Sequence, residues 1–224
     1  MSNEWFFLLS LLADLLFVSF AARRGTEWLF STIAVNLILV AIFGSKLISV
    51  FGLVTNAGNI FYACVFLSTH ILIERHGKRT GFRSIWFGVF FMVFFALMSQ
   101  LTTKFSGLSL SSEANVAIVT LFSSSLRVAF ASVLAYTFAQ YVNVSIYECL
   151  KTYTKDKYLW LRSNGANIVA QLVDSLLFFS IAFFDLPGTI LLQTILVGWL
   201  FKTLIVFIGT PLLYLNTYME KRKS

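Results

Sequence analysis

The chain contains few of the residues that build metal centres and disulfide frameworks. Its 224 residues include two cysteines (Cys64 and Cys149) and two histidines (His70 and His76). Neither pair has metal-ligand spacing, and the cysteines do not form the pattern of a disulfide framework. We therefore expect neither a metal nor a cofactor.

Motifs of catalysis are also lacking. The sequence has no Gly-x-Ser-x-Gly, no His-Glu-x-x-His, no Walker loop and no intramembrane Gly-x-Gly-Asp pair. These absences argue against an enzyme and leave an intramembrane enzyme acting on lipid as a remote alternative. Without a P-loop, any active transport would not be powered by an ATPase within this chain.

Charged residues are scarce, and apolar ones dominate. Only 12% of the residues are charged and 58% are hydrophobic, with a mean hydropathy of +0.82. This composition predicts an all-α polytopic membrane protein, with one transmembrane domain over residues 1–224. We expect a compact bundle of about seven transmembrane helices, with six as the alternative. The predicted spans are residues 5–22, 28–47, 59–73, 85–101, 126–150, 164–184 and 189–214; the apolar stretch 115–122 is either an interfacial or re-entrant segment or part of the fifth span.

The net charge of +7 lies mainly in loops between the apolar runs. The loops at 75–83 and 151–162 and the tail at 221–223 are basic, whereas the intervening loops carry little charge. The positive-inside rule then predicts the N-terminus outside and the C-terminus inside. We expect a multi-pass protein of the inner or plasma membrane of a prokaryotic cell, with the lipid bilayer and not nucleic acid as its partner. The oligomeric state is left open.

The stretch 162–179 carries polar side chains into the apolar layer. Asn164, Asn167, Gln171 and Asp174 are spaced by three, four and three residues, which places them on one stripe about 80° wide. An Asp near the bilayer centre costs roughly 2.5–3.5 kcal/mol on insertion scales. We expect this stripe to face a cavity and bind substrate; hydrogen bonding between helices is the alternative.

Two further spans have polar faces. In the third span, Asn59, His70 and Glu74 share a stripe, although Glu74 could instead lie at the interface and pair with Arg75 or Arg79, contributing little. In the fifth span, Gln140 and Asn143 share a face with two tyrosines and either bind substrate or hydrogen-bond between helices.

The last span contains a lysine near its middle. Lys202 is too deep to reach the interface easily, so we expect it to face the bundle interior beside a carboxylate. Asp174 is the first candidate for its partner and Asp14 the second. Pro211 can kink or unwind the same helix, or serve packing alone.

Three segments in order resemble the queuosine precursor transporter family, also called the vitamin uptake transporter family. They are residues 70–79 (HILIERHGKR), 162–178 (RSNGANIVAQLVDSLLF) and 202–215 (KTLIVFIGTPLLYL), and the resemblance covers nearly the whole chain. The positions that match the family pattern are Glu74, Gly77, Arg162, Gln171, Asp174, Lys202, Thr210, Pro211 and Tyr214.

Some positions depart from that pattern. His70, Asn143 and Gly209 stand where the family has acidic residues, and Ala166-Asn167 replaces a Ser-Thr pair. Asn167 is therefore a candidate through its own chemistry. Because these three acidic residues are missing, the substrate or the coupling to protons can differ from that of a typical family member.

The resemblance implies import of a 7-deazaguanine-type base into the cytoplasm for tRNA modification. Alternating access would occur around a polar cavity centred on Asp174. The partner would be a small heterocyclic base, whose adjacent donors a carboxylate can accept. The alternatives are another flat heterocycle, such as a purine or vitamin, or a substrate-capturing subunit that needs a separate energising module.

Overall fold

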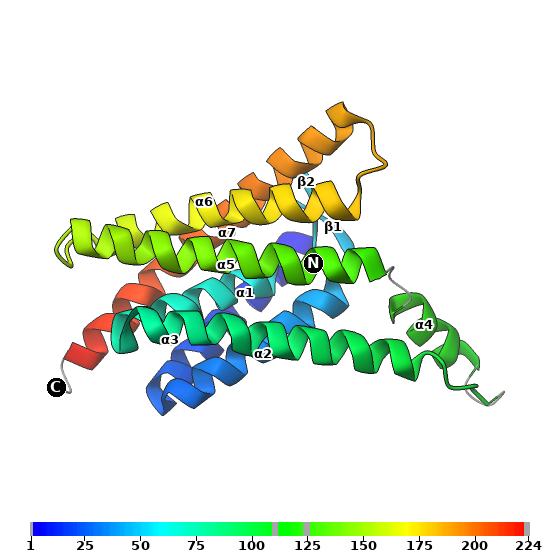
Figure 1. Cartoon of the computed structure of the whole chain (residues 1–224), viewed down its shortest axis with the longest axis horizontal. Coiled ribbons are helices and arrows are strands. Elements are labelled where there is room, and N and C mark those ends of the chain that lie inside the picture. The colour runs from blue at the N-terminus through cyan, green and yellow to red at the C-terminus, as the bar shows by residue number, and fades with distance from the viewer. Residues whose placement is uncertain (1, 109–111, 123–125, 222–224) are drawn as a thin grey trace.

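The chain is an all-α polytopic membrane protein. The computed structural model describes residues 2–108, 112–122 and 126–221 (Figure 1). Six of the described helices are long and apolar enough to cross a membrane. The elements are α1 (Asn3–Arg24), α2 (Thr26–Phe43), β1 (Leu47–Val50), β2 (Leu53–Asn56), α3 (Asn59–Thr102), α4 (Ser112–Phe122), α5 (Leu126–Tyr153), α6 (Leu159–Ala182) and α7 (Gly188–Lys221).

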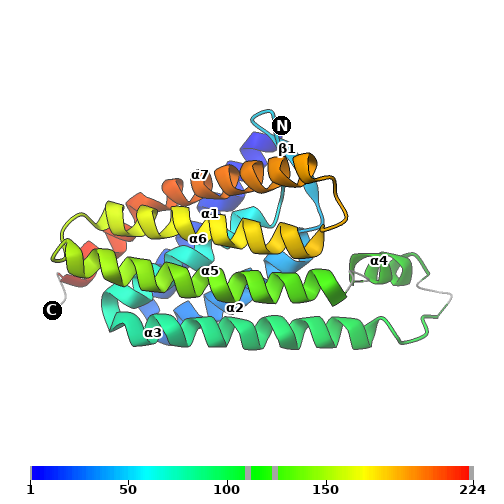
Figure 2. The same cartoon turned by 45° about the horizontal axis from the view of Figure 1, so that its top comes forward.

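The 44 residues of α3 contain a kink at Gly77. A straight helix of that length would extend about 66 Å, twice the roughly 30 Å of a bilayer core. Gly77 has a φ of 78° and a ψ of 176°, a conformation that a residue without a Cβ adopts readily. The chain folds back there (Figures 1 and 2). Segments 59–76 and 78–102 therefore correspond to the predicted third and fourth spans, which gives seven crossing segments.

A two-stranded hairpin lies between α2 and α3, where the sequence indicated only a weak break. Strand β1 pairs antiparallel with β2, with Val50 opposite Leu53. Phe51 and Gly52 form the turn, and both have positive φ, as a type I′ hairpin requires. The predicted second span was therefore too long, because α2 ends at Phe43.

The helix ends gather at two opposite ends of the bundle. One end holds the α1–α2 junction, the Gly77 kink, the α5–α6 loop and the end of α7; the other holds the hairpin (Figure 2). We name these the basic end and the hairpin end. Arg75 joins elements at the basic end, since its guanidinium donates to the carbonyl oxygens of Ala22 in α1 and Asn216 in α7.

The first half of α3 forms the centre of the bundle. It is almost continuously buried from residue 59 to residue 73, and α3 packs against α1, α2, α5 and α7, while α6 packs against α5 and α7. The polar faces of α3, α5, α6 and α7 are thereby directed toward one another. Helix α7 continues through Pro211, so the backbone is not unwound there, and the stretch 115–122 belongs to the separate short helix α4.

Candidate functional site

The polar stripe of α6 is buried inside the bundle. Asn164, Asn167, Gln171 and Asp174 have exposed fractions between 0 and 5%. The two ends of the stripe meet α3 and α7, which supply the partners of Asp174 and of Asn164. The stripe therefore faces protein and not lipid.

Asp174 lies between a tyrosine and a lysine from two other helices. The Tyr62 hydroxyl of α3 donates to Asp174 Oδ1 at 2.7 Å, and Lys202 Nζ of α7 lies 2.5 Å from Asp174 Oδ2. Asp174, the first of the two predicted candidates, is thus the partner of Lys202. A buried ion pair is kept stable only when its remaining hydrogen bonds are also made, and Tyr62 makes one of them.

Two amides next to Asp174 have no partners. Within the described residues, neither polar atom of the Asn167 side chain and neither polar atom of the Gln171 side chain makes a hydrogen bond. Ser175 Oγ, one turn further along α6, is also buried and unpaired. Buried polar groups are nearly always paired in proteins, and leaving one unpaired costs about 1–3 kcal/mol. These groups are therefore candidates for contact with a polar ligand.

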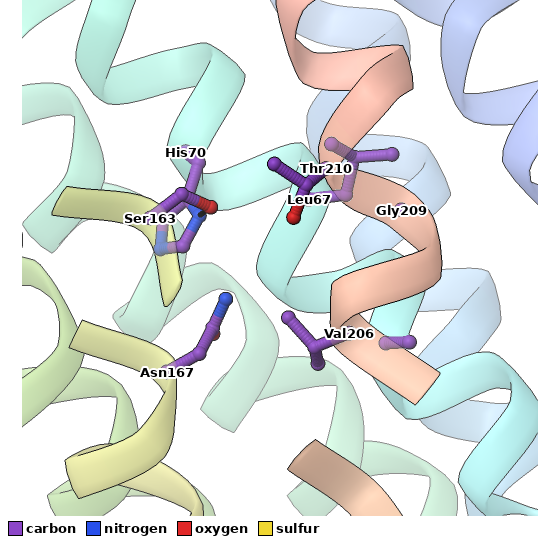
Figure 3. Close-up of a pocket in the computed structure, with 8 residues that line it drawn as sticks. Leu67, His70, Ser163, Asn167, Val206, Gly209 and Thr210 are labelled. Atoms are coloured by element: carbon purple, nitrogen blue, oxygen red, sulfur yellow. Dashed lines mark hydrogen bonds between the residues drawn. The ribbon is translucent and has the colours of Figure 1, made fainter. Parts of the chain in front are cut away.

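A small cavity adjoins the unpaired amide of Asn167. It is lined by residues of α3, α6 and α7, namely Ala63, Leu67, His70, Ser163, Asn167, Val206, Gly209 and Thr210. Figure 3 shows the Asn167 side chain directed into the space that Leu67 and Val206 close on the opposite side. The cavity volume is about 10 Å³, which is room for about one water molecule.

His70 connects the cavity to α5. Its Nδ1 lies 3.0 Å from Ser163 Oγ and its Nε2 lies 3.0 Å from Asn143 Oδ1. Because Asn143 Oδ1 can only accept, Nε2 carries the proton and Nδ1 accepts from the Ser163 hydroxyl. Asn143 Nδ2 in turn donates to Gln140 Oε1 at 3.3 Å. His70, Asn143 and Gln140 thus form one continuous network.

Glu74 forms a second buried ion pair nearer the basic end. Arg162 Nε donates to Glu74 Oε1 at 2.8 Å, and Arg162 Nη2 donates to Glu74 Oε2 at 2.9 Å. The Tyr147 hydroxyl of α5 also donates to Oε1, at 2.8 Å. The alternative partners Arg75 and Arg79 are therefore wrong: the Glu74 side chain is 8% exposed, pairs with Arg162 and joins α3, α5 and α6.

The remaining predicted residues lie at the edges of the site. Asn164 Oδ1 accepts from Thr210 Oγ1 at 3.0 Å and so joins α6 to α7. Asn59 is separate from this network, because its side chain donates to Thr55 Oγ1 at the end of the hairpin. No group of three or more His, Cys, Asp or Glu side chains that could hold a metal occurs in the described residues.

Tyr62 and Ser163 were missed as site residues. At 100° per residue, Tyr62 lies on the same broad face of α3 as Asn59, Phe66 and His70. It lies just outside the stripe formed by Asn59, His70 and Glu74. Ser163 directly precedes Asn164, and a single serine in an apolar helix does not by itself predict a binding residue. Arg162 and Thr210 matched the family pattern but were not assigned to the site.

A multi-span bundle with a buried, partly unpaired polar centre is the architecture of a membrane carrier for small polar molecules. Residues 56–216 match the model of a family described as "putative vitamin uptake transporter". The chain belongs to this transporter family. It is also 29% identical over 219 residues to a Bacillus subtilis (strain 168) protein named "probable queuosine precursor transporter", covering 95% of this chain and 93% of that protein. No solved structure matches the chain.

Proposed function

We propose that this transporter imports a queuosine precursor, a 7-deazaguanine-type base, through a site centred on Asp174. The family and the printed name of the Bacillus subtilis relative support this substrate. The observation that carries the proposal is a pair of buried amides that have no partner among the described residues: Asn167, two turns from Asp174, and Gln171, one turn from it.

The chemistry of these side chains fits the edge of such a base. A guanine-like edge presents two adjacent donors, which a carboxylate accepts through both oxygens, and a carbonyl oxygen, which an amide N–H or a lysine can bind. Asp174 would accept from the two donors in place of Tyr62 and Lys202. Gln171, Asn167 and the released Lys202 would then bind the carbonyl oxygen and the ring nitrogens.

Transport requires the helices around this site to separate. The cavity of about 10 Å³ is far smaller than the roughly 300 Å³ or more of typical ligand pockets, which supports a closed conformation as one state of the proposed cycle. The charges of the loops support an orientation with the basic end in the cytoplasm. In that orientation, two sets of contacts close the cytoplasmic exit. One is Glu74 with Arg162 and Tyr147, and the other is the network of His70, Asn143 and Gln140. The hydrogen bond between Asn164 and Thr210 holds α6 to α7. Asn59 would meet the base on the hairpin side.

Rescue of tRNA modification in cells is the direct test of this function. A host lacking both synthesis and uptake of the base would be supplied with it and would express wild-type protein, Asp174→Asn or Asp185→Asn. Asp185 is an exposed acid paired with Arg127, so its variant is a matched control. We expect the modified nucleoside with wild type and Asp185→Asn, but not with Asp174→Asn. Equal rescue by Asp174→Asn at matched expression would contradict the assignment.

A second candidate is transport of another flat heterocycle by the same site. Two observations favour it: the family description names vitamins, and His70, Asn143 and Gly209 stand where the resemblance leads us to expect acids. Competition of uptake by guanine, 7-deazaguanine and vitamins would separate these substrates. Uptake by the purified protein alone in liposomes would exclude a subunit that depends on a separate energising module.

A further inference from the structure

Another carboxyl, the partly buried Asp14, lies outside the proposed base site. Asn36 Nδ2 of α2 donates to Asp14 Oδ1 at 3.3 Å. The Asp14 Oδ2 atom is buried and unpaired. Among the described residues, no Lys, Arg or His nitrogen lies within salt-bridge distance of Asp14. Asp14 therefore differs from Glu74 and Asp174, which both have cationic partners.

The Asp14–Asn36 contact is half of a carboxylic acid–amide pair. In the full pair, the amide N–H donates to one acid oxygen and the acid O–H donates to the amide oxygen. The first bond is present, while the two atoms of the second bond, Asp14 Oδ2 and Asn36 Oδ1, are both buried without a partner. Both are acceptors when the carboxyl is ionised. A single proton on Asp14 Oδ2 would supply the missing donor.

We propose that Asp14 is a proton-binding site and that its proton drives import of the base. The coupling part of this inference rests on the proposed function, whereas proton binding does not. An ionisable side chain in a transmembrane helix that has no ion-pair partner is suited to this task, because only its neutral form is stable in an apolar layer.

A cavity at the hairpin end reaches to within about one helical turn of Asp14 along α1. This cavity of about 330 Å³ lies between α1, α2, β1 and α3, and its lining includes Phe7, Ser10, Phe43 and Ile60. Ser10 precedes Asp14 by one helical turn on the same face of α1, and Ile60 precedes Cys64 by one turn of α3. The cavity thus leads from the hairpin end toward the carboxyl.

The packing of α1 on α7 can transmit the protonation state to the base site. Phe7 contacts Phe201 with ring centroids 5.7 Å apart, and Phe201 directly precedes Lys202. Leu15, next to Asp14, lies against Gly209, where an added Cβ would meet Leu15 Cδ2 at 3.4 Å. The segment of α1 that carries Asp14 therefore contacts α7 at Phe7 and at Leu15. Helix α7 also carries Lys202 and Thr210.

None of the titratable and charged groups named around Asp14 replaces it as the proton acceptor. From α3 it meets the Cys64 thiol, and α2 presents only the neutral Asn36. On α7, Lys202 is bound to Asp174. Lys46 lines the cavity, and Glu4 accepts from the backbone N–H of Phe51 at the hairpin.

Transport by purified protein in liposomes tests the coupling. Uptake of radiolabelled 7-deazaguanine would be measured with and without an inward proton gradient for wild type, Asp14→Asn, Asp14→Glu and the control Asp185→Asn. We expect gradient-driven accumulation, abolished by a protonophore, for all except Asp14→Asn, which would only equilibrate the base. Gradient-independent accumulation by wild type, accumulation driven by sodium instead, or accumulation by Asp14→Asn would overturn the coupling.

Infrared spectroscopy of the same purified proteins tests proton binding without any substrate. We expect wild type to show a protonated-carboxyl stretch that titrates with pH and is missing in Asp14→Asn but retained in Asp185→Asn. Identical spectra for wild type and Asp14→Asn would overturn the site. If the base is not transported at all, the proposed function fails, and the infrared result still decides whether Asp14 binds a proton.

Discussion

Two carboxylates in the polar centre have the same kinds of partner but differ in how these partners hold them. Asp174 meets Tyr62 and Lys202, and Glu74 meets Tyr147 and Arg162. Arg162 binds Glu74 through two parallel N–H bonds, whereas Lys202 approaches Asp174 with a single ammonium group.

The difference suits the Glu74–Arg162 pair to holding helices together and the Asp174–Lys202 pair to giving way to a substrate. A guanidinium held by two bonds has a fixed orientation, while lysine is a compact charge on a flexible chain. The Asp174 pair also lies beside the unpaired amides of Asn167 and Gln171, whereas Glu74 has a second cation beside it, Lys151 Nζ at 3.9 Å from Oε2. We infer that the Glu74 pair holds the basic end closed and that the Asp174 pair is opened by substrate.

The largest expected effect is on stability at the Glu74 pair. Arg162→Ala should lower the free energy of unfolding by up to about 3–5 kcal/mol, because it removes both guanidinium hydrogen bonds to Glu74 and leaves only Lys151 Nζ, 3.9 Å from Glu74 Oε2, as a neighbouring cation. Arg127→Ala removes a cation from a pair in which Asp185 is 61% exposed, so it should cost at most about 1 kcal/mol. Unfolding of both variants in detergent micelles measures the difference, and equal losses would show that the Glu74 pair does not hold the helices together.

The next largest effect is on uptake at the Asp174 pair. Asp174→Asn replaces one acceptor oxygen by an NH2 group and removes the charge, which is worth about 1.5–3 kcal/mol for a charge-assisted hydrogen bond, so uptake at low substrate should fall about 100-fold. Asn is isosteric with Asp but leaves Lys202 without its counter-charge, so uptake is compared at equal amounts of folded protein. Uptake is measured in cells that lack their own transporter, with Asp185→Asn as the control. Wild-type uptake by Asp174→Asn would remove Asp174 from the site.

Much of the fold could be predicted because apolar runs and loop charges are local signals. The spans follow from hydropathy, and the stripe of α6 follows from the spacing of Asn164, Asn167, Gln171 and Asp174 alone. The hairpin could not be predicted, because its two strands have four residues each and read as an extension of the neighbouring apolar segment.

Pairings within the site depend on tertiary packing. Glu74 and Arg162 are 88 residues apart in the chain, and charge alone allowed Arg75 or Arg79 as the partner. Arg75 is instead directed toward carbonyl oxygens at the ends of α1 and α7. Likewise, Tyr62 is a tyrosine in an apolar run, and only the approach of α6 to α3 places its hydroxyl on Asp174.

A smaller effect distinguishes unpaired amides from paired ones. Gln171→Ala should lower uptake about tenfold, the loss of one hydrogen bond of roughly 1.4 kcal/mol to the substrate. It should not lower stability, because Gln171 has no protein partner to lose among the described residues. Asn143→Ala is the matched comparison: it leaves His70 Nε2 unpaired and should cost about 1–3 kcal/mol of stability. Loss of stability without loss of uptake in Gln171→Ala would identify that amide as structural.

The smallest expected changes in substrate affinity come from the two tyrosine hydroxyls. Tyr62→Phe and Tyr147→Phe each remove one hydrogen bond to a carboxylate, at a cost of roughly 1.5–3 kcal/mol at most. If substrate replaces Tyr62 on Asp174, the Tyr62 bond competes with binding, so Tyr62→Phe should bind the base a few-fold more tightly while losing stability. Tyr147 does not compete, so Tyr147→Phe should lose stability with unchanged affinity. Binding titrations and unfolding of the two purified variants check this, and weaker binding by Tyr62→Phe would mean that its hydroxyl contacts the base directly.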